Sequence, residues 1–171
     1  MNLSKTLLSD LKKYIDAMWV PDTEQVRAET PAQTGTPVEK GADYTSKDAK
    51  NLEDLIGELG ESFHEMLFRK IRESGMPEAD IYKKGNLDRK LFSKIRSNPA
   101  YHPRKGTVLA LAIALQLDSD GTVELLAKAG YALSPGSKAD LIVKYFIERS
   151  VYDINVINYA LNEFGQPTLG G

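Results

Sequence analysis

The sequence contains no cysteine among its 171 residues. Disulfide bonds, thiolate zinc sites and a cysteine nucleophile are therefore excluded. Long apolar runs are also lacking, because the longest, residues 108–115, is far too short to cross a bilayer. The first twenty residues do not have the pattern of a secretory signal, since Asp10, Lys12, Lys13 and Asp16 interrupt any apolar stretch. These absences favour a soluble cytoplasmic protein that does not enter a membrane.

Catalytic and metal-binding patterns are lacking as well. Only two histidines are present, and no HExxH spacing occurs. His64 with Glu61 or Glu65, and Glu53 with Asp54, are better interpreted as solvated helix faces than as metal ligands. No glycine-rich phosphate loop and no GxSxG motif is found. The sequence therefore predicts a protein that is not an enzyme and that needs no metal and no cofactor.

What the sequence does have is apolar residues at helical spacing over most of its length, with no alternating pattern of useful length. The predicted fold class is all-α. Residues 105–117 are the most apolar segment and are expected to lie at the centre of the core. Ser137 and Asp140 have the spacing of a capping box, with Asp in place of Glu. The predicted helices after the first are 51–59, 61–73, 78–84, 88–97, 105–117, 121–129, 137–149 and 153–164.

The N-terminal part of the chain differs from the rest. Residues 2–19 carry an apolar stripe at helical spacing, whereas residues 21–44 contain three prolines and almost no large apolar side chain. We expect an amphipathic helix at 1–20, a flexible linker at 21–44 and a helical domain at 45–171, from which the first 44 residues are separable. The stripe must be buried somewhere, and its own domain, a second copy and another protein all remain open. The candidate partner-binding residues are Leu3, Leu7, Leu11, Ile15 and Trp19.

The most unusual stretch of the sequence is residues 83–105. It carries eight Lys or Arg and one acid, a net charge of +7, whereas the whole chain carries −2. Such an island is either a solvated helix face or the electrostatic footprint of a surface that meets phosphates.

The pattern of the charges within this stretch favours the phosphate interpretation. In a helix over residues 88–97, with Asp88 as its N-cap, Leu91, Phe92 and Ile95 share one face and belong to the core. The other face carries cations and hydroxyls, which are groups that can read base edges in the major groove. Further cations follow at the start of the next predicted helix, where they could clamp a phosphate. The candidate DNA-binding residues are Arg89, Lys90, Ser93, Lys94, Arg96, Ser97, His102, Arg104 and Lys105.

Three stretches of the sequence predict short helices in a distinctive order. They are residues 71–84, 87–96 and 103–117. Together they resemble the helix-turn-helix domain of lambda-repressor-like (Xre/Cro family) DNA-binding proteins, over about residues 68–117. The resemblance implies that helix 88–97 is a recognition helix. Two positions depart from the family pattern: Tyr82 stands where the family usually has Ala, and Glu78 stands where a Gln commonly meets a phosphate or base.

The resemblance and the basic stretch together predict a sequence-specific transcriptional regulator of bacterial or phage type. Its partner would be double-stranded DNA, and it is expected to act as a homodimer, because one helix-turn-helix reads only a short half-site. The alternative is a helical adaptor that keeps this fold but binds proteins. That alternative rests on the net acidic charge, on Glu78 and on the tethered N-terminal helix.

Overall fold

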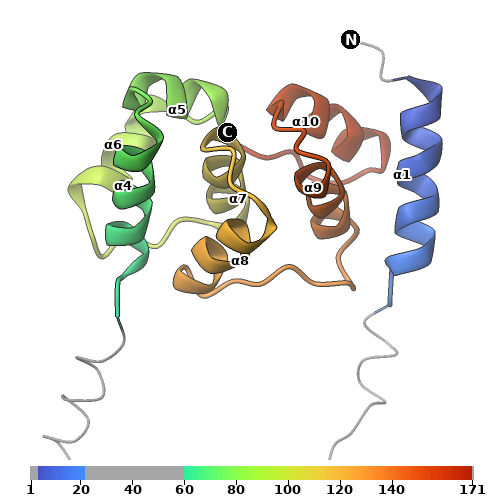
Figure 1. Ribbon diagram of the computed structural model, residues 1–171, viewed down its shortest axis with the longest axis horizontal. Coiled ribbons are helices and arrows are strands. Elements are labelled where there is room, and N and C mark those ends of the chain that lie inside the picture. The colour runs from blue at the N-terminus through green and yellow to red at the C-terminus, as the bar shows by residue number, and fades with distance from the viewer. Residues whose placement is uncertain (1–3, 22–59, 171) are drawn as a thin grey trace, which may run out of the picture.

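The computed structural model describes residues 4–21 and 60–170 of the chain. Within these residues the fold is all-α, with eight helices and no β-strand, as predicted. The predicted helix at 51–59, and Leu3 of the N-terminal stripe, lie outside the described residues. The helices are α1 (Lys5–Met18), α4 (Phe63–Ser74), α5 (Glu78–Lys84), α6 (Arg89–Ser97), α7 (Lys105–Ala114), α8 (Ser119–Lys128), α9 (Lys138–Glu148) and α10 (Ile154–Glu163), labelled in Figure 1.

Polar residues at the helix starts fix where the elements begin. Ser4 caps α1 by accepting a hydrogen bond from the backbone N–H of Thr6. Ser62 and Glu65 form a complete capping box at the start of α4. Asp88 caps α6, its carboxylate accepting from the backbone N–H of Lys90. Each cap satisfies N–H groups that have no partner inside the helix.

Helix α7 is the central element of the core. Every residue from Thr107 to Ala114 is buried, and α7 packs against α5, α8 and α10. The expectation that the most apolar segment is the core helix is therefore confirmed. The helix ends three residues earlier than predicted, because Gln116 adopts a left-handed conformation with φ of 55° and the backbone N–H of Leu117 turns back to Ala112.

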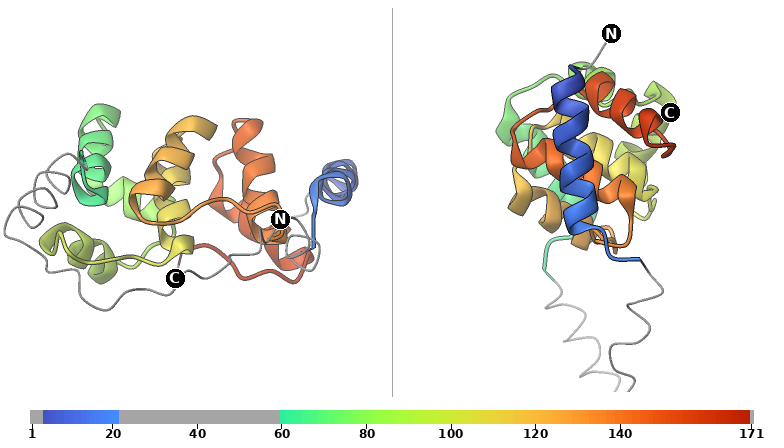
Figure 2. Two further views of the ribbon diagram at one scale, coloured as in Figure 1. Left: turned by 90° about the horizontal axis from the view of Figure 1, so that it is seen from below. Right: turned by 90° about the vertical axis from the view of Figure 1, so that its right-hand side faces the viewer.

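The helices are arranged as a row. Helices α4, α5 and α6 form one end, α7 and α8 the middle, α9 and α10 the next part, and α1 the opposite end (Figures 1 and 2). Helix α1 thus lies far from α4, the next described element along the chain. It packs against α9 of the same chain.

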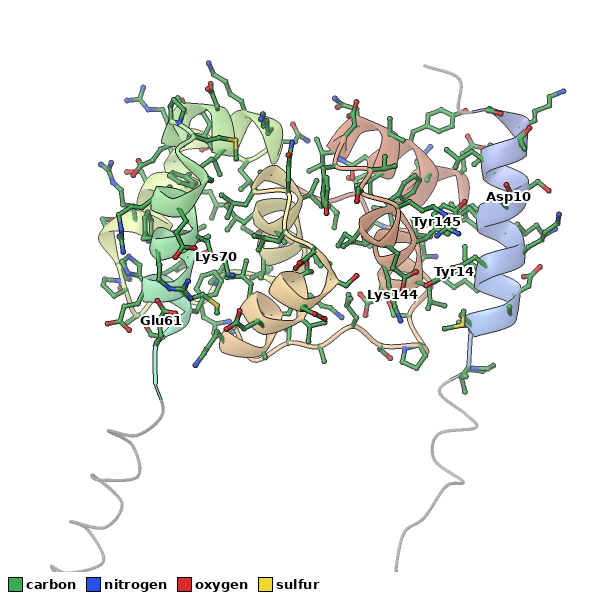
Figure 3. All side chains as sticks on the ribbon, viewed as in Figure 1. Asp10, Tyr14, Glu61, Lys70, Lys144 and Tyr145 are labelled. Atoms are coloured by element: carbon green, nitrogen blue, oxygen red, sulfur yellow. The ribbon has the colours of Figure 1, made fainter. Side chains whose placement is uncertain are left out.

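The contact between α1 and α9 combines apolar burial with an aromatic cluster. Leu11 and Ile15 are 0% and 3% exposed. The rings of Tyr14 and Tyr145 meet edge to face at 5.2 Å and point toward one another in Figure 3. The Tyr14 hydroxyl donates to Glu148 at 3.0 Å. Burial, and then this hydrogen bond to a carboxylate, raise the pKa of Tyr14 to about 12.

The other residues of the stripe complete the contact. Leu7 is half-buried, and the Trp19 indole donates to the Gly136 carbonyl at 3.1 Å while the Lys138 ammonium lies 4.3 Å from its ring centroid. Of the possibilities that the sequence left open, the structure shows docking within the same chain. Leu11 and Ile15 are consequently covered in the monomer. Helix α1 contributes these buried side chains to the core, whereas residues 22–44 lie outside the described residues, so the separability of residues 1–44 stays a prediction.

Candidate nucleic-acid interface

Helices α5 and α6 are joined by a four-residue turn that is held from two sides. Asn86 has a φ of 49°, in the left-handed region that Asn tolerates, and the N–H of Leu87 donates to the Tyr82 carbonyl at 2.8 Å. On the side of the turn that faces α7, a Cβ on Gly85 would lie 3.1 Å from the carbonyl oxygen of Ala110. The glycine thus allows the turn to approach the central helix closely.

The segment that follows α10, up to Gly170, also contacts this turn. The side-chain amide of Asn158 in α10 accepts from the N–H of Leu169 at 2.8 Å and donates to its carbonyl at 3.0 Å. Leu169 is buried. A Cβ on Gly170 would lie 2.4 Å from the carbonyl oxygen of Asn86, so only glycine fits there. The turn that orients α6 is therefore supported by the central helix and by the C-terminal segment.

The inner face of α6 is anchored by aromatic packing. Phe92 and Ile95 are buried, and Leu91 is half-buried, as the helical spacing predicted. The Phe92 ring lies 5.8 Å from the ring of Tyr82 and 6.3 Å from that of Phe68. Tyr82, where the resembled family usually has Ala, thus fills the space between α5 and α6 with an aromatic ring.

The outer face of α6 carries the predicted polar residues. Arg89, Lys90, Ser93, Lys94, Arg96 and Ser97 are all exposed. One helix therefore presents four cations and two hydroxyls to solvent on the side opposite its core contacts. The Lys94 ammonium lies 4.2 Å from the ring centroid of Tyr101, a cation–π contact with the loop that follows α6.

The residues after α6 divide into two groups. His102 and Arg104 are exposed, and the His102 ring lies 5.3 Å from that of Tyr131. Lys105 is different, because its ammonium is paired with the Asp140 carboxylate. Asp140 is only 4% exposed and also accepts from the backbone N–H of Ser134. Lys105 is therefore already paired with a buried counter-charge, and its expected role in clamping a phosphate stays a prediction.

Sequence reasoning also missed the ion pair between α5 and α6. Arg96 Nη1 donates to Glu78 Oε2 at 2.9 Å. In the sequence, Glu78 is notable only because it stands where the resembled family commonly has a Gln. The two residues are eighteen positions apart on different helices, so no helical spacing relates them. The helix order of the resembled family was the only signal that could have brought them together.

Of the residues that could have suggested a metal site, Glu61, Glu65 and His64 have other partners, and Glu53 and Asp54 lie outside the described residues. Glu61 accepts two hydrogen bonds from the Arg69 guanidinium, at 2.8 Å each, which lower its pKa. Glu65 belongs to the capping box, and the hydrogen bonds from Ser62 lower its pKa. His64 Nε2 lies 3.1 Å from the Arg96 carbonyl. Among the described residues, no group of three His, Cys, Asp or Glu side chains is arranged to hold a metal ion.

Comparison with known proteins gives no relative for this chain: no family model, no curated protein and no solved structure matches it. In residues 4–21 and 60–170, no helix is long and apolar enough to cross a membrane.

Proposed function

We propose that this chain is a sequence-specific, double-stranded-DNA-binding regulator of transcription. In this proposal α5, the four-residue turn and α6 are the helix-turn-helix of a lambda-repressor-like domain, and α6 lies in the major groove. The observation that supports it is the asymmetry of α6. One face of this helix is buried, and its other face exposes four cations and two hydroxyls. Arg, Lys and Ser are groups that read base edges and phosphates.

The proposed interface extends beyond α6. Arg104 is the N-cap residue of α7, and no side chain in the described part of the chain caps the first N–H groups of that helix. A helix N-terminus with neighbouring cations suits a DNA phosphate, so we assign His102 and Arg104 to backbone contacts. A nine-residue helix is only about 13 Å long and spans a short half-site. The proposed active form is therefore a homodimer on a two-fold symmetric site.

The experiment that tests this function is a salt series of duplex-DNA binding. Each phosphate contact should contribute about 0.9 to the slope of the logarithm of the binding constant against the logarithm of salt concentration. Arg89→Ala and Lys94→Ala should each weaken binding to a selected site by about 1–3 kcal/mol. Because both side chains are exposed, stability should change by less than about 0.5 kcal/mol.

Lys12→Ala is the matched control, because Lys12 is an exposed cation on α1, at the opposite end of the row of helices (Figure 1). It should leave DNA binding unchanged. Wild-type affinity in both α6 variants would contradict the assignment of the recognition helix. Weak binding of the wild type at every salt concentration would contradict DNA binding altogether.

A second candidate function is a helical adaptor for proteins. The observation that favours it lies at the end of α1, where Met18, Trp19 and Val20 are consecutive exposed apolar residues. Neighbouring exposed apolar side chains mark a protein contact site where they form a contiguous patch. This function would be supported by a binding partner whose affinity falls in Met18→Ser and not in Arg89→Ala.

A further inference from the structure

A narrow groove runs between α5 and α6 on the proposed DNA-binding side. Its volume is about 250 Å³, and it is lined on the α6 side by Arg89, Ser93 and Arg96, which are spaced along one face of the helix. On the α5 side, Glu78 and Tyr82 line it. The Glu78–Arg96 ion pair therefore lies within the surface that α6 would present to DNA.

The pair leaves hydrogen-bonding capacity on both partners. The side chains of Arg96 and Glu78 are 59% and 39% exposed. In the described residues the pair uses only Nη1 of the guanidinium and only Oε2 of the carboxylate. The remaining guanidinium N–H groups can still donate, and Oε1 can still accept. The site thus presents a donor fork and an anionic acceptor side by side.

The backbone of α6 is fixed where this pair is formed. The Arg96 carbonyl lies 3.1 Å from His64 Nε2 of α4, and the neighbouring Ile95 is buried. The charge of Glu78 in turn holds the Arg96 guanidinium over the groove. Such a preorganised side chain loses less conformational entropy when it binds a base.

This donor and acceptor set matches one base pair. In the major groove, guanine presents two acceptors, O6 and N7, which an Arg fork contacts bidentately, and the paired cytosine presents the N4 amino donor, which a Glu accepts. If thymine replaced the cytosine, its O4 acceptor would face the Glu78 carboxylate, and two acceptors repel one another. A phosphate at this position would also be repelled by Glu78. We infer that the Glu78–Arg96 pair is a specificity determinant that reads a C·G base pair within the bound half-site.

This inference rests on the proposed function, and the test separates the two. Duplexes that bind the full-length wild type are first selected from a random pool, and each base pair of the selected site is then changed in turn. The site should contain one C·G pair whose replacement by T·A lowers affinity by about 5- to 150-fold.

Two variants assign that preference to the ion pair. Glu78→Gln should reduce the discrimination at this base pair to less than about threefold and tighten binding to random DNA, because the acceptor charge that opposes phosphates is removed. Arg96→Lys keeps the positive charge but loses the fork, so it should lose the same discrimination without tightening binding to random DNA.

Glu124→Gln is the matched control, since Glu124 is an exposed acid of α8 that pairs with Lys70 at 3.6 Å. It should keep the wild-type preference. A selected site with no C·G dependence, or a Glu78→Gln variant that discriminates as Glu124→Gln does, would overturn the inference and leave DNA binding intact. Failure of the wild type to bind any duplex at low salt would overturn the proposed function and this inference together.

Discussion

Truncation of Leu11 should release α1 from the rest of the protein before the rest unfolds. Leu11 is completely buried, and α9 is the element that α1 mainly contacts. A buried Leu→Ala change costs about 2.7–5.0 kcal/mol, through lost transfer free energy and the cavity that remains. A loss of about 3 kcal/mol would raise the population of molecules with undocked α1 roughly a hundredfold.

A single tryptophan allows the release of α1 to be followed by fluorescence. Trp19 is the only tryptophan of the chain, and it lies directly after α1, bonded to Gly136. Its fluorescence should therefore report α1 docking, whereas far-ultraviolet circular dichroism reports all of the helices. In urea, Leu11→Ala should show a fluorescence transition at lower denaturant concentration than the dichroism transition.

Leu161→Ala is the matched control. Leu161 of α10 is equally buried, but its truncation weakens the interior, so both transitions should move together to lower urea concentration. Coincident transitions in Leu11→Ala would refute our reasoning, because α1 would then unfold as one cooperative unit with the other helices. An unchanged stability would show that α1 does not dock on α9.

Two further predictions concern polar contacts. Asp140→Asn removes the counter-charge of the Lys105 ammonium, whose side chain is 29% exposed. The free energy of unfolding, measured in urea, should therefore fall by about 1.5–3 kcal/mol, and a change below about 0.5 kcal/mol would contradict this. The hydrogen bonds from Ser62 lower the pKa of Glu65 in the folded state, so they stabilise the protein above the pKa of the unfolded chain and are lost as the pH falls through the folded pKa. The wild type should accordingly melt at a higher temperature than Glu65→Gln at pH 7, and the gap between the two melting temperatures should narrow as the pH falls below the ordinary range of a Glu carboxyl. A gap that stays constant with pH would show that the Glu65 charge does not contribute.

Local patterns in the sequence predicted the helices and their inner faces. The apolar run of α7 and the spacing of Leu91, Phe92 and Ile95 in α6 depend on the helical repeat alone, and the structure places them as expected. The caps by Ser4 and Asp88 were predictable for the same reason, since a cap contacts residues only two or three positions away.

Contacts between distant residues were not predictable in the same way. The stripe of α1 indicated that Leu11 and Ile15 need burial, but an amphipathic pattern does not specify the surface that covers them. The spacing of Ser137 and Asp140 indicated a capping box. Ser137 does cap α9 by accepting from the Asp140 N–H, but the Asp140 carboxylate binds Lys105, thirty-five residues away. The distant residue that a side chain contacts depends on how the helices pack, and patterns of neighbouring residues do not determine that packing.

The position of α1 at the far end of the row also has a consequence for synthesis on the ribosome. Helix α1 is made before every other described helix, but α9 begins about 120 residues later. At about 5–20 residues per second, the Leu11–Ile15 stripe has no partner for roughly 6–24 seconds. During that interval its apolar side chains have no folded surface to cover them, and a 14-residue helix is only marginally stable by itself. Its docking joins helices about 120 residues apart in the sequence and should be among the last folding events.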